Sequence, residues 1–227
     1  EMSASLVGSE MCIRDRDSFI YTNVWLDCPE DIKEFLLKLS VLGGFTLTQC
    51  VAQTGRRESE CYDILMGIGF VKYNESEHTY TFNPVFRHFI SDILANETSE
   101  VIYNITLNAA HTYMASGSFY EAIELYARVG HYQEIYDSDI SLGKLYAYVI
   151  KSNKDTFFDI ANHYWSVEKN GHYEFAVVIS FIMFLFNERH TLTKLLSDIR
   201  KDISNDKLLT NEQIIDYNAC LLYTSPS

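Results

Sequence analysis

Two short segments with alternating aromatic residues constrain the fold most, because they are the only convincing β-strands in this sequence. They are Phe70–Tyr73 and Thr79–Phe82, separated by the five polar residues 74–78. Alternation at period two on both sides of a polar turn is typical of an antiparallel hairpin. From residue 97 onward the sequence shows helical periods only. The chain is therefore predicted to be mainly α-helical, with one hairpin.

Helices are predicted on both sides of this hairpin. Apolar residues on one helical face, with a glycine close after each segment, predict helices over 31–42, 47–53 and 59–68. After the hairpin, Pro84 at a first helical position opens a helix whose apolar stripe reaches Leu94. Three helices, a hairpin wing and a closing helix predict a small winged-helix domain over residues 17–97.

Residues 98–219 are predicted to form a helical array. The expected helices span 101–115, 118–129, 132–137, 142–150, 156–167, 173–186 and 192–203, and a last one follows Thr210. Small and bulky residues in the first two helices have the spacing of one tetratricopeptide-like unit; they are Ala110, Tyr113, Ala122 and Tyr126. We therefore expect an α-solenoid of irregular tetratricopeptide-like hairpins. Its aromatic residues are expected mostly in the core, with some on a concave binding surface.

Both ends of the sequence have the pattern of a translated sequencing adaptor. The codons that fit Gly8–Arg16 and, on the opposite strand, Cys220–Ser227 belong to one oligonucleotide, which resembles a transposon mosaic end. Unrelated termini would not encode opposite strands of the same oligonucleotide. We therefore expect residues 1–16 and 220–227 to be adaptor artefacts, outside any reasoning about the fold, and the natural sequence between them to be a fragment.

The composition limits the partners of the chain. It has 31 Asp and Glu against 18 Lys and Arg, a net charge of −13. An acidic surface repels phosphate backbones, so we expect no direct nucleic-acid binding. The longest apolar stretch, 175–186, is shorter than the ~18 residues of a membrane span, which favours a helix buried in protein and no membrane contact. Cys28, Cys50 and Cys61 lack disulfide or metal spacing, which favours reduced thiols and a cytoplasmic location.

No catalytic or metal site is predicted. The histidines show neither a triad nor metal spacing, and the sequence contains no G-x-x-x-x-G-K-[ST] phosphate loop, so ATP hydrolysis is not expected. Arg56 and Arg57 precede the third helix, where a DNA-binding winged helix would enter the major groove. The acids that follow, Glu58, Glu60 and Asp63, disfavour such binding. We expect the two arginines to face solvent or a neighbouring domain.

A set of segments also occurs in a characteristic order and spacing. They are Ile32–Leu42, Phe45–Thr46, Leu65–Met66, Gly69–Val71, Tyr80–Phe89, Ala109–Gly117 and Tyr120–Ile123. Together they resemble the middle of the large MalT-like, ATP-dependent regulators of the LuxR family, over residues 31–134. The resemblance implies a parent protein with an ATPase domain, which holds ATP or ADP, before this region and a DNA-binding helix-turn-helix after it. In that family the winged helix packs against the ATPase domain, and the helical array senses an inducer or a protein partner.

Asn83 is the one candidate cofactor-contacting residue. The resemblance implies it, because the family usually has a histidine at this place, close to the bound nucleotide. An asparagine amide still donates a hydrogen bond but carries no positive charge. Since asparagine is also a favoured N-cap residue and Pro84 follows it, capping of the next helix is the alternative role.

These features predict a sensor and coupling segment of a bacterial transcription regulator, without enzymatic activity of its own. The helical array would bind an effector or a protein partner, and the winged helix would relay the change to the ATPase domain. The alternative is a tetratricopeptide-like protein-interaction scaffold unrelated to transcription, because the helical hairpins alone would suffice for it.

Overall fold

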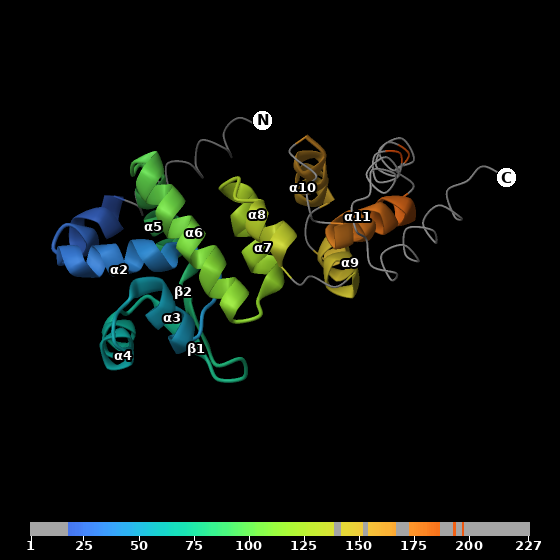
Figure 1. Cartoon of the computed structure of the whole chain (residues 1–227). Coiled ribbons are helices and arrows are strands. Elements are labelled where there is room, and N and C mark those ends of the chain that lie inside the picture. Colours follow the sequence, from blue (N-terminus) through green and yellow to red (C-terminus); the bar gives the residue numbers. More distant parts are fainter. Residues whose placement is uncertain are drawn as a thin grey trace, which may run out of the picture. The chain divides into compact units, whose positions relative to one another are not determined.

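Figure 1 shows the computed structural model of the chain, in which residues 18–138, 142–151, 154–166 and 173–186 are described, together with 193 and 197. The chain divides into two compact units, Glu1–Ser118 and Phe119–Ser227, called unit 1 and unit 2. Each unit is described by itself. The predicted helices over 192–203 and after Thr210, and the expected adaptor segments 1–16 and 220–227, lie outside the described residues.

Near the start of its described residues, unit 1 contains a π-helical turn that the sequence did not indicate. This turn, η1 (Tyr21–Trp25), is closed by a hydrogen bond of 3.0 Å from the Leu26 N–H to the Tyr21 carbonyl. Trp25 is buried, and its ring meets that of Phe89 edge to face with 5.7 Å between the centroids. Such a pair contributes about 0.5–1.5 kcal/mol beyond its burial. η1 is therefore part of the core of unit 1.

The three helices predicted before the hairpin are present, with bounds within two residues of the prediction. They are α2 (Glu30–Ser40), α3 (Leu47–Thr54) and α4 (Glu58–Gly67). A capping box starts α3: the Thr46 hydroxyl accepts from the Gln49 N–H, and the Gln49 side chain accepts from the Thr46 N–H. Gly55, with a φ of 73°, ends α3 in a left-handed conformation that glycine adopts without steric cost.

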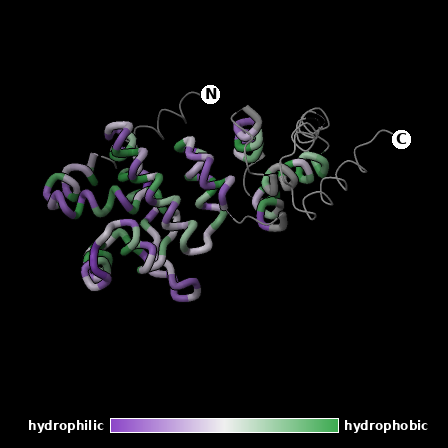
Figure 2. Tube along the Cα trace, in the orientation of Figure 1, coloured by the Kyte–Doolittle hydropathy of each residue, from purple (hydrophilic) through white to green (hydrophobic). Residues whose placement is uncertain are grey.

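The predicted hairpin forms the wing. Its strands β1 (Val71–Asn74) and β2 (Thr79–Phe82) are antiparallel. Phe45 forms an additional single bridge, because its N–H donates to the Tyr80 carbonyl and its carbonyl accepts from the Tyr80 N–H. Both rings are buried and stack with 6.2 Å between their centroids. The wing is thus fixed to the loop before α3, and its polar tip faces away from the apolar core (Figure 2).

The helix α5 (Pro84–Ala95) closes the winged helix and packs on α2. Phe70, predicted as the first strand residue, lies just before β1 and stacks on Phe86 at 4.6 Å between centroids. Burying one large apolar side chain contributes about 1.5–3 kcal/mol. The buried side chains of this core include Phe35, Leu36, Leu39, Leu42, Phe45, Leu65, Phe82, Phe86, Phe89 and Ile90.

The helix α6 (Ser99–Ala115) also belongs to unit 1. It packs on α3, and its small residues Ala109 and Ala110 are fully buried. Small side chains allow two helix axes to approach closely. The compact unit therefore extends to Ser118, beyond the domain boundary expected after residue 97, because α6 makes its contacts with the winged helix.

Unit 2 is helical in its described residues. Its helices are α7 (Phe119–Arg128), α8 (Gln133–Asp137), α9 (Leu142–Lys151), α10 (Lys154–Ser166) and α11 (Tyr173–Leu185). All lie within two residues of the predicted bounds. α7 packs on α8 and α10, and α9 packs on α10 and α11. The predicted fold class, mainly helical with a winged-helix domain, is confirmed, whereas the arrangement as tetratricopeptide-like hairpins stays a prediction.

α11 contains the most apolar stretch of the chain. Its side chains Phe175, Ile179, Ile182 and Met183 are buried, as predicted for a helix that packs within protein. In the described part of the chain, no helix is both long and apolar enough to cross a membrane.

We predict that Leu39→Ala lowers the free energy of unfolding of unit 1 by about 2–5 kcal/mol. Leu39 is a fully buried residue of α2, so truncation of its side chain leaves a cavity. Leu26→Ala, at a position where the same side chain is 53% exposed, is the matched control and should cost less than about 0.5 kcal/mol. Urea unfolding followed by circular dichroism measures both. Equal losses for the two variants would contradict the assigned core.

Candidate functional site

Asn83 serves as an N-cap. Its side-chain oxygen accepts a hydrogen bond of 3.0 Å from the Val85 N–H, and Pro84 occupies the first helical position. The Asn83 N–H also donates to the Phe70 carbonyl at 2.7 Å, which joins the end of the wing to the start of α5. The capping role is thus confirmed. The nucleotide contact implied by the family resemblance stays a prediction.

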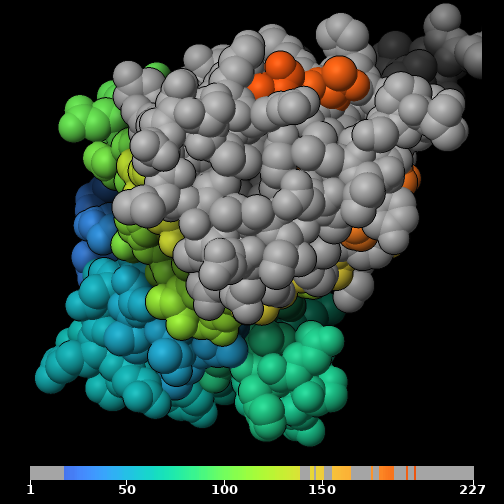
Figure 3. Space-filling model, turned by 45° about the vertical axis from the view of Figure 1, so that its right-hand side comes forward, coloured from blue at the N-terminus to red at the C-terminus, as the bar shows by residue number. Residues whose placement is uncertain are grey.

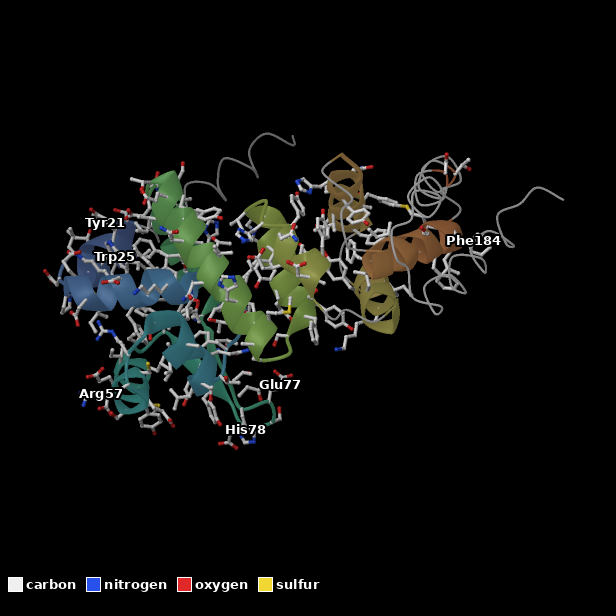
Figure 4. All side chains as sticks on the ribbon, in the orientation of Figure 1. Tyr21, Trp25, Arg57, Glu77, His78 and Phe184 are labelled. Carbon is white, nitrogen blue, oxygen red and sulfur yellow. The ribbon has the colours of Figure 1, made fainter. Side chains whose placement is uncertain are left out.

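Arg56 and Arg57 have different surroundings. Arg56 donates to the Asp31 carbonyl at 2.8 Å and to the Asp31 carboxylate at 3.2 Å, and its guanidinium lies 5.8 Å from the centre of the Phe35 ring. Arg57 pairs with Glu60, which lowers the pKa of that carboxyl, and its side chain is 80% exposed at the start of α4 (Figure 4). Arg57 is thus exposed to solvent, whereas Arg56 is half-buried and its bonds hold the segment before α4 to the start of α2. That a neighbouring domain lies against Arg56 stays a prediction.

The buried amide of Gln53 joins three helices of unit 1. Its Nε2 donates to the Lys38 carbonyl at the end of α2, at 2.9 Å, and to the Ile105 carbonyl of α6, at 3.1 Å. Its Oε1 accepts from the Asn108 side chain of α6, at 3.0 Å. Thr112 lies within 3.5 Å of the same oxygen. Because each polar atom of this buried amide has a partner, α6 has one favoured register on α3.

Two further contacts hold the second half of α6. The Tyr113 hydroxyl accepts from the Gly43 N–H at 2.9 Å and donates to the Gly44 carbonyl at 3.3 Å. Gln49 donates to the Ser116 hydroxyl at 2.8 Å. The polar contacts therefore extend along α6 from Ile105 to its C-terminal end, so a displacement of α6 acts on both α3 and the loop after α2.

In unit 2, a carboxylate joins three helices. Glu124 of α7 accepts from the Tyr148 hydroxyl of α9 at 2.6 Å and from the Thr156 hydroxyl of α10 at 3.3 Å. Tyr148 is fully buried, and burial first, then its bond to Glu124, raises the pKa of its hydroxyl. The Tyr120 ring stacks on Tyr148 with 6.2 Å between centroids. Glu124 thus organises the packing of α7, α9 and α10.

A second polar contact lies in the aromatic core of unit 2. The Tyr136 hydroxyl is 2.9 Å from the His163 Nδ1 and donates to the Ile160 carbonyl at 3.3 Å. The Tyr132 ring stacks on His163 with 3.9 Å between centroids. Burial lowers the pKa of His163 and raises the pKa of Tyr136, so both neutral forms are favoured. Tyr136 and Tyr164 are buried, as expected for core aromatics.

The described residues contain no cluster of metal ligands, and two of their cysteines are buried thiols. No three His, Cys, Asp or Glu side chains in this part come together as metal ligands. Cys50 and Cys61 are fully buried side by side, and burial raises the pKa of the Cys50 thiol. A buried thiol with a raised pKa has little reactive thiolate.

The elements of unit 1 define a winged-helix domain: three helices, a two-stranded wing bridged to Phe45, and the closing helix α5. Residues 21–102 are similar to the MalT winged helix domain, and this match includes η1, the wing and the start of α6. The match supports a MalT-like region, as the sequence resemblance implied. No curated protein matches the chain.

We predict that Gln53→Leu lowers the free energy of unfolding by about 2 kcal/mol, because it removes the side-chain hydrogen bonds to the Lys38 and Ile105 carbonyls and leaves the Asn108 amide only its bond to the Gln53 backbone carbonyl. Amide hydrogen exchange in α6 should also become faster, since the contact fixes α6 on α3. Gln133→Leu, at an exposed position in α8, is the matched control. Unchanged exchange in α6 would show that Gln53 does not hold it.

We predict that Tyr148→Phe destabilises unit 2 by about 1–3 kcal/mol near neutral pH, because the hydroxyl bond to the Glu124 carboxylate is lost. The pKa of Tyr148 is raised in the folded chain, so its contribution is complete below the unfolded value of about 10 and falls as the pH rises above it. The difference between wild type and variant should therefore narrow in alkali. Denaturant unfolding at several pH values measures it, with the exposed Tyr62→Phe as control.

Proposed function

We propose that this chain is the sensor and coupling segment of a bacterial, MalT-like transcription regulator of the LuxR family, and that it has no enzymatic activity of its own. The observation that carries the proposal is the similarity of residues 21–102 to the MalT winged helix domain. In this proposal, ATP or ADP binds to an ATPase domain of the parent protein and DNA binds to its helix-turn-helix. The protein acts in the cytoplasm.

The contacts of α6 support the coupling step. Gln53, Gln49 and Tyr113 tie α6 to the winged helix by directed hydrogen bonds at both halves of the helix. A signal that displaces α6 has to break or shift these bonds, because their donors and acceptors are largely buried. In the proposal, unit 2 binds the effector or protein partner, and α6 relays the change to the winged helix and from there to the ATPase domain.

The charge of α4 supports a coupling role of the winged helix in place of DNA binding. In a DNA-binding winged helix, the third helix enters the major groove. Here the exposed positions of that helix include Glu58 and Asp63, and Arg57 is paired with Glu60. A carboxylate facing a phosphate backbone is repelled, so recognition of the target sequence falls to the proposed helix-turn-helix.

A second candidate function is a tetratricopeptide-like scaffold for protein interactions that is unrelated to transcription. The helical packing of unit 2 favours it, because aromatic residues such as Tyr126 and Tyr148 are buried between neighbouring helices. This function needs no ATPase domain and no helix-turn-helix.

Recovery of the full-length gene distinguishes the two. For the regulator, we predict a G-x-x-x-x-G-K-[ST] phosphate loop encoded upstream of residue 17 and a helix-turn-helix downstream of residue 219. The purified full-length protein should then bind ATP, and a lysine substitution in the phosphate loop should abolish this binding. A gene without either element would refute the regulator and favour the scaffold.

A further inference from the structure

The loop between α2 and α3 contacts both the wing and the C-terminal end of α6. Phe45 of this loop forms the bridge to Tyr80 of β2, with two backbone hydrogen bonds of 3.0 Å and 2.7 Å in opposite directions. Because the bridge uses the N–H and the carbonyl of Tyr80, this residue faces Tyr73 of β1 as a non-hydrogen-bonded pair. The loop therefore holds the edge of β2 that β1 leaves free.

Before Phe45, the loop is held by the buried residue Tyr113 of α6. The Tyr113 hydroxyl accepts from the Gly43 N–H at 2.9 Å and donates to the Gly44 carbonyl at 3.3 Å. Gly44 in turn lies against β2, since a Cβ at this position would be only 3.3 Å from the Thr81 Cγ2. The absence of a side chain allows this close approach. The bonds of Tyr113 therefore reach a segment that packs directly on the wing.

After Phe45, the loop is held to α6 through the side chain of Gln49. Its amide nitrogen donates to the hydroxyl of Ser116, the C-cap residue of α6, at 2.8 Å. Its amide oxygen accepts from the N–H of Thr46, the residue that follows Phe45, at 2.8 Å. The bridge residue thus lies between two attachments to the end of α6, one through Tyr113 and one through Ser116.

The wing depends on contacts at its base. It projects from the body of unit 1 (Figure 3), and Glu77 and His78 lie at its tip (Figure 4). A two-stranded hairpin is only marginally stable by itself, so its position depends on the elements that it contacts. The hydrogen bonds to Phe45 supply one such contact, beside the stacking of Phe70 on Phe86. A change at the end of α6 therefore has a path of hydrogen-bonded groups to the wing.

We propose that residues 43–46 form a coupling joint, through which the C-terminal end of α6 controls how firmly the wing is held. While Tyr113 and Ser116 keep their bonds, Phe45 is fixed and its bridge to Tyr80 is closed. When the end of α6 moves away, these bonds break and the bridge opens more often. The use of this joint in signalling rests on the proposed function, whereas the coupling itself requires only the contacts of unit 1.

Amide hydrogen exchange of the full 227-residue chain, measured by NMR, tests the coupling. The Tyr80 N–H donates to the Phe45 carbonyl, so its exchange rate reports the opening of the bridge. Exchange that low urea leaves unchanged identifies a local opening, because such an opening exposes little surface. Tyr113→Phe keeps the ring and removes both hydroxyl bonds, so exchange of the Tyr80 amide should become on the order of tenfold faster.

Two control variants separate this coupling from a general loss of stability. Gln53→Leu removes hydrogen bonds to the middle of α6 and leaves those of Tyr113 in place. It should change the local exchange rate of the Tyr80 amide less than about threefold, because its contacts do not reach the loop. Tyr148→Phe removes a buried tyrosine hydroxyl in unit 2 and should change this rate less than about twofold.

A second pair of variants acts on the joint itself. Gly44→Ala places a methyl group against Thr81 and should speed exchange of both the Tyr80 amide and the Tyr113 amide about threefold or more. Both ends should respond because coupling is reciprocal. Gly43→Ala is the matched control, since its Cβ would be 3.8 Å from the Arg87 guanidinium, an ordinary contact, and it should leave both rates within about twofold.

Four results would overturn the proposal. An unchanged Tyr80 rate in Tyr113→Phe refutes the coupling, and so does exchange of this amide by global unfolding alone. Equal acceleration by Gln53→Leu would show that any loosening of unit 1 releases the wing. A response to Gly44→Ala at Tyr80 alone would show that the loop packs on the wing without joining it to α6. A full-length gene without a phosphate loop would instead refute the regulator and leave the coupling intact.

Discussion

The arrangement of unit 1 depends on the buried amide of Gln53. Apolar contacts pack the ridges of one helix into the grooves of the other, and the Gln53 amide adds partners on both sides at fixed positions. It donates to carbonyls of α2 and α6 and accepts from Asn108. A shift of α6 by one turn would break the bonds to Ile105 and Asn108 but not the bond to Lys38 of α2, and each buried polar atom left without a partner costs about 1–3 kcal/mol. The winged helix and α6 therefore behave as one body.

The position of α6 also explains why Tyr113 has a different partner from the one that its sequence spacing suggested. Tyr113 fits the spacing of a tetratricopeptide-like unit, where a bulky aromatic residue packs against the next helix. In the structure its hydroxyl bonds to Gly43 and Gly44, in the loop that follows α2. The spacing predicted a buried aromatic residue correctly. It did not reveal the partner, because periodicity describes which face of a helix is buried and not what covers it.

The helices could be predicted because their ends are encoded locally. Asn83 before Pro84 and Gly55 after α3 are such signals, and each acts within a few residues. η1 could not be predicted, since five residues in a π-helical turn give no period. The contacts of Gln53 and Glu124 could not be predicted either, because their partners lie 15–59 and 24–32 residues away along the chain. The hydrogen-bond partners in each unit could therefore be identified only from the structure.

The hydrogen bonds of Gln53 in unit 1 and of Glu124 in unit 2 differ in charge and in the number of their partners. The Gln53 amide is neutral, and each of its polar atoms has a partner, which favours a rigid connection. Glu124 has a half-buried carboxyl group, and the two bonds described for it come from the hydroxyl groups of Tyr148 and Thr156. A carboxylate has about four acceptor positions, so it can accept hydrogen bonds from more than one helix at once. A change in charge near Glu124 would therefore act on α7, α9 and α10 together. In unit 1 the same kind of change would meet a neutral network in which each polar atom of the Gln53 amide already has a partner.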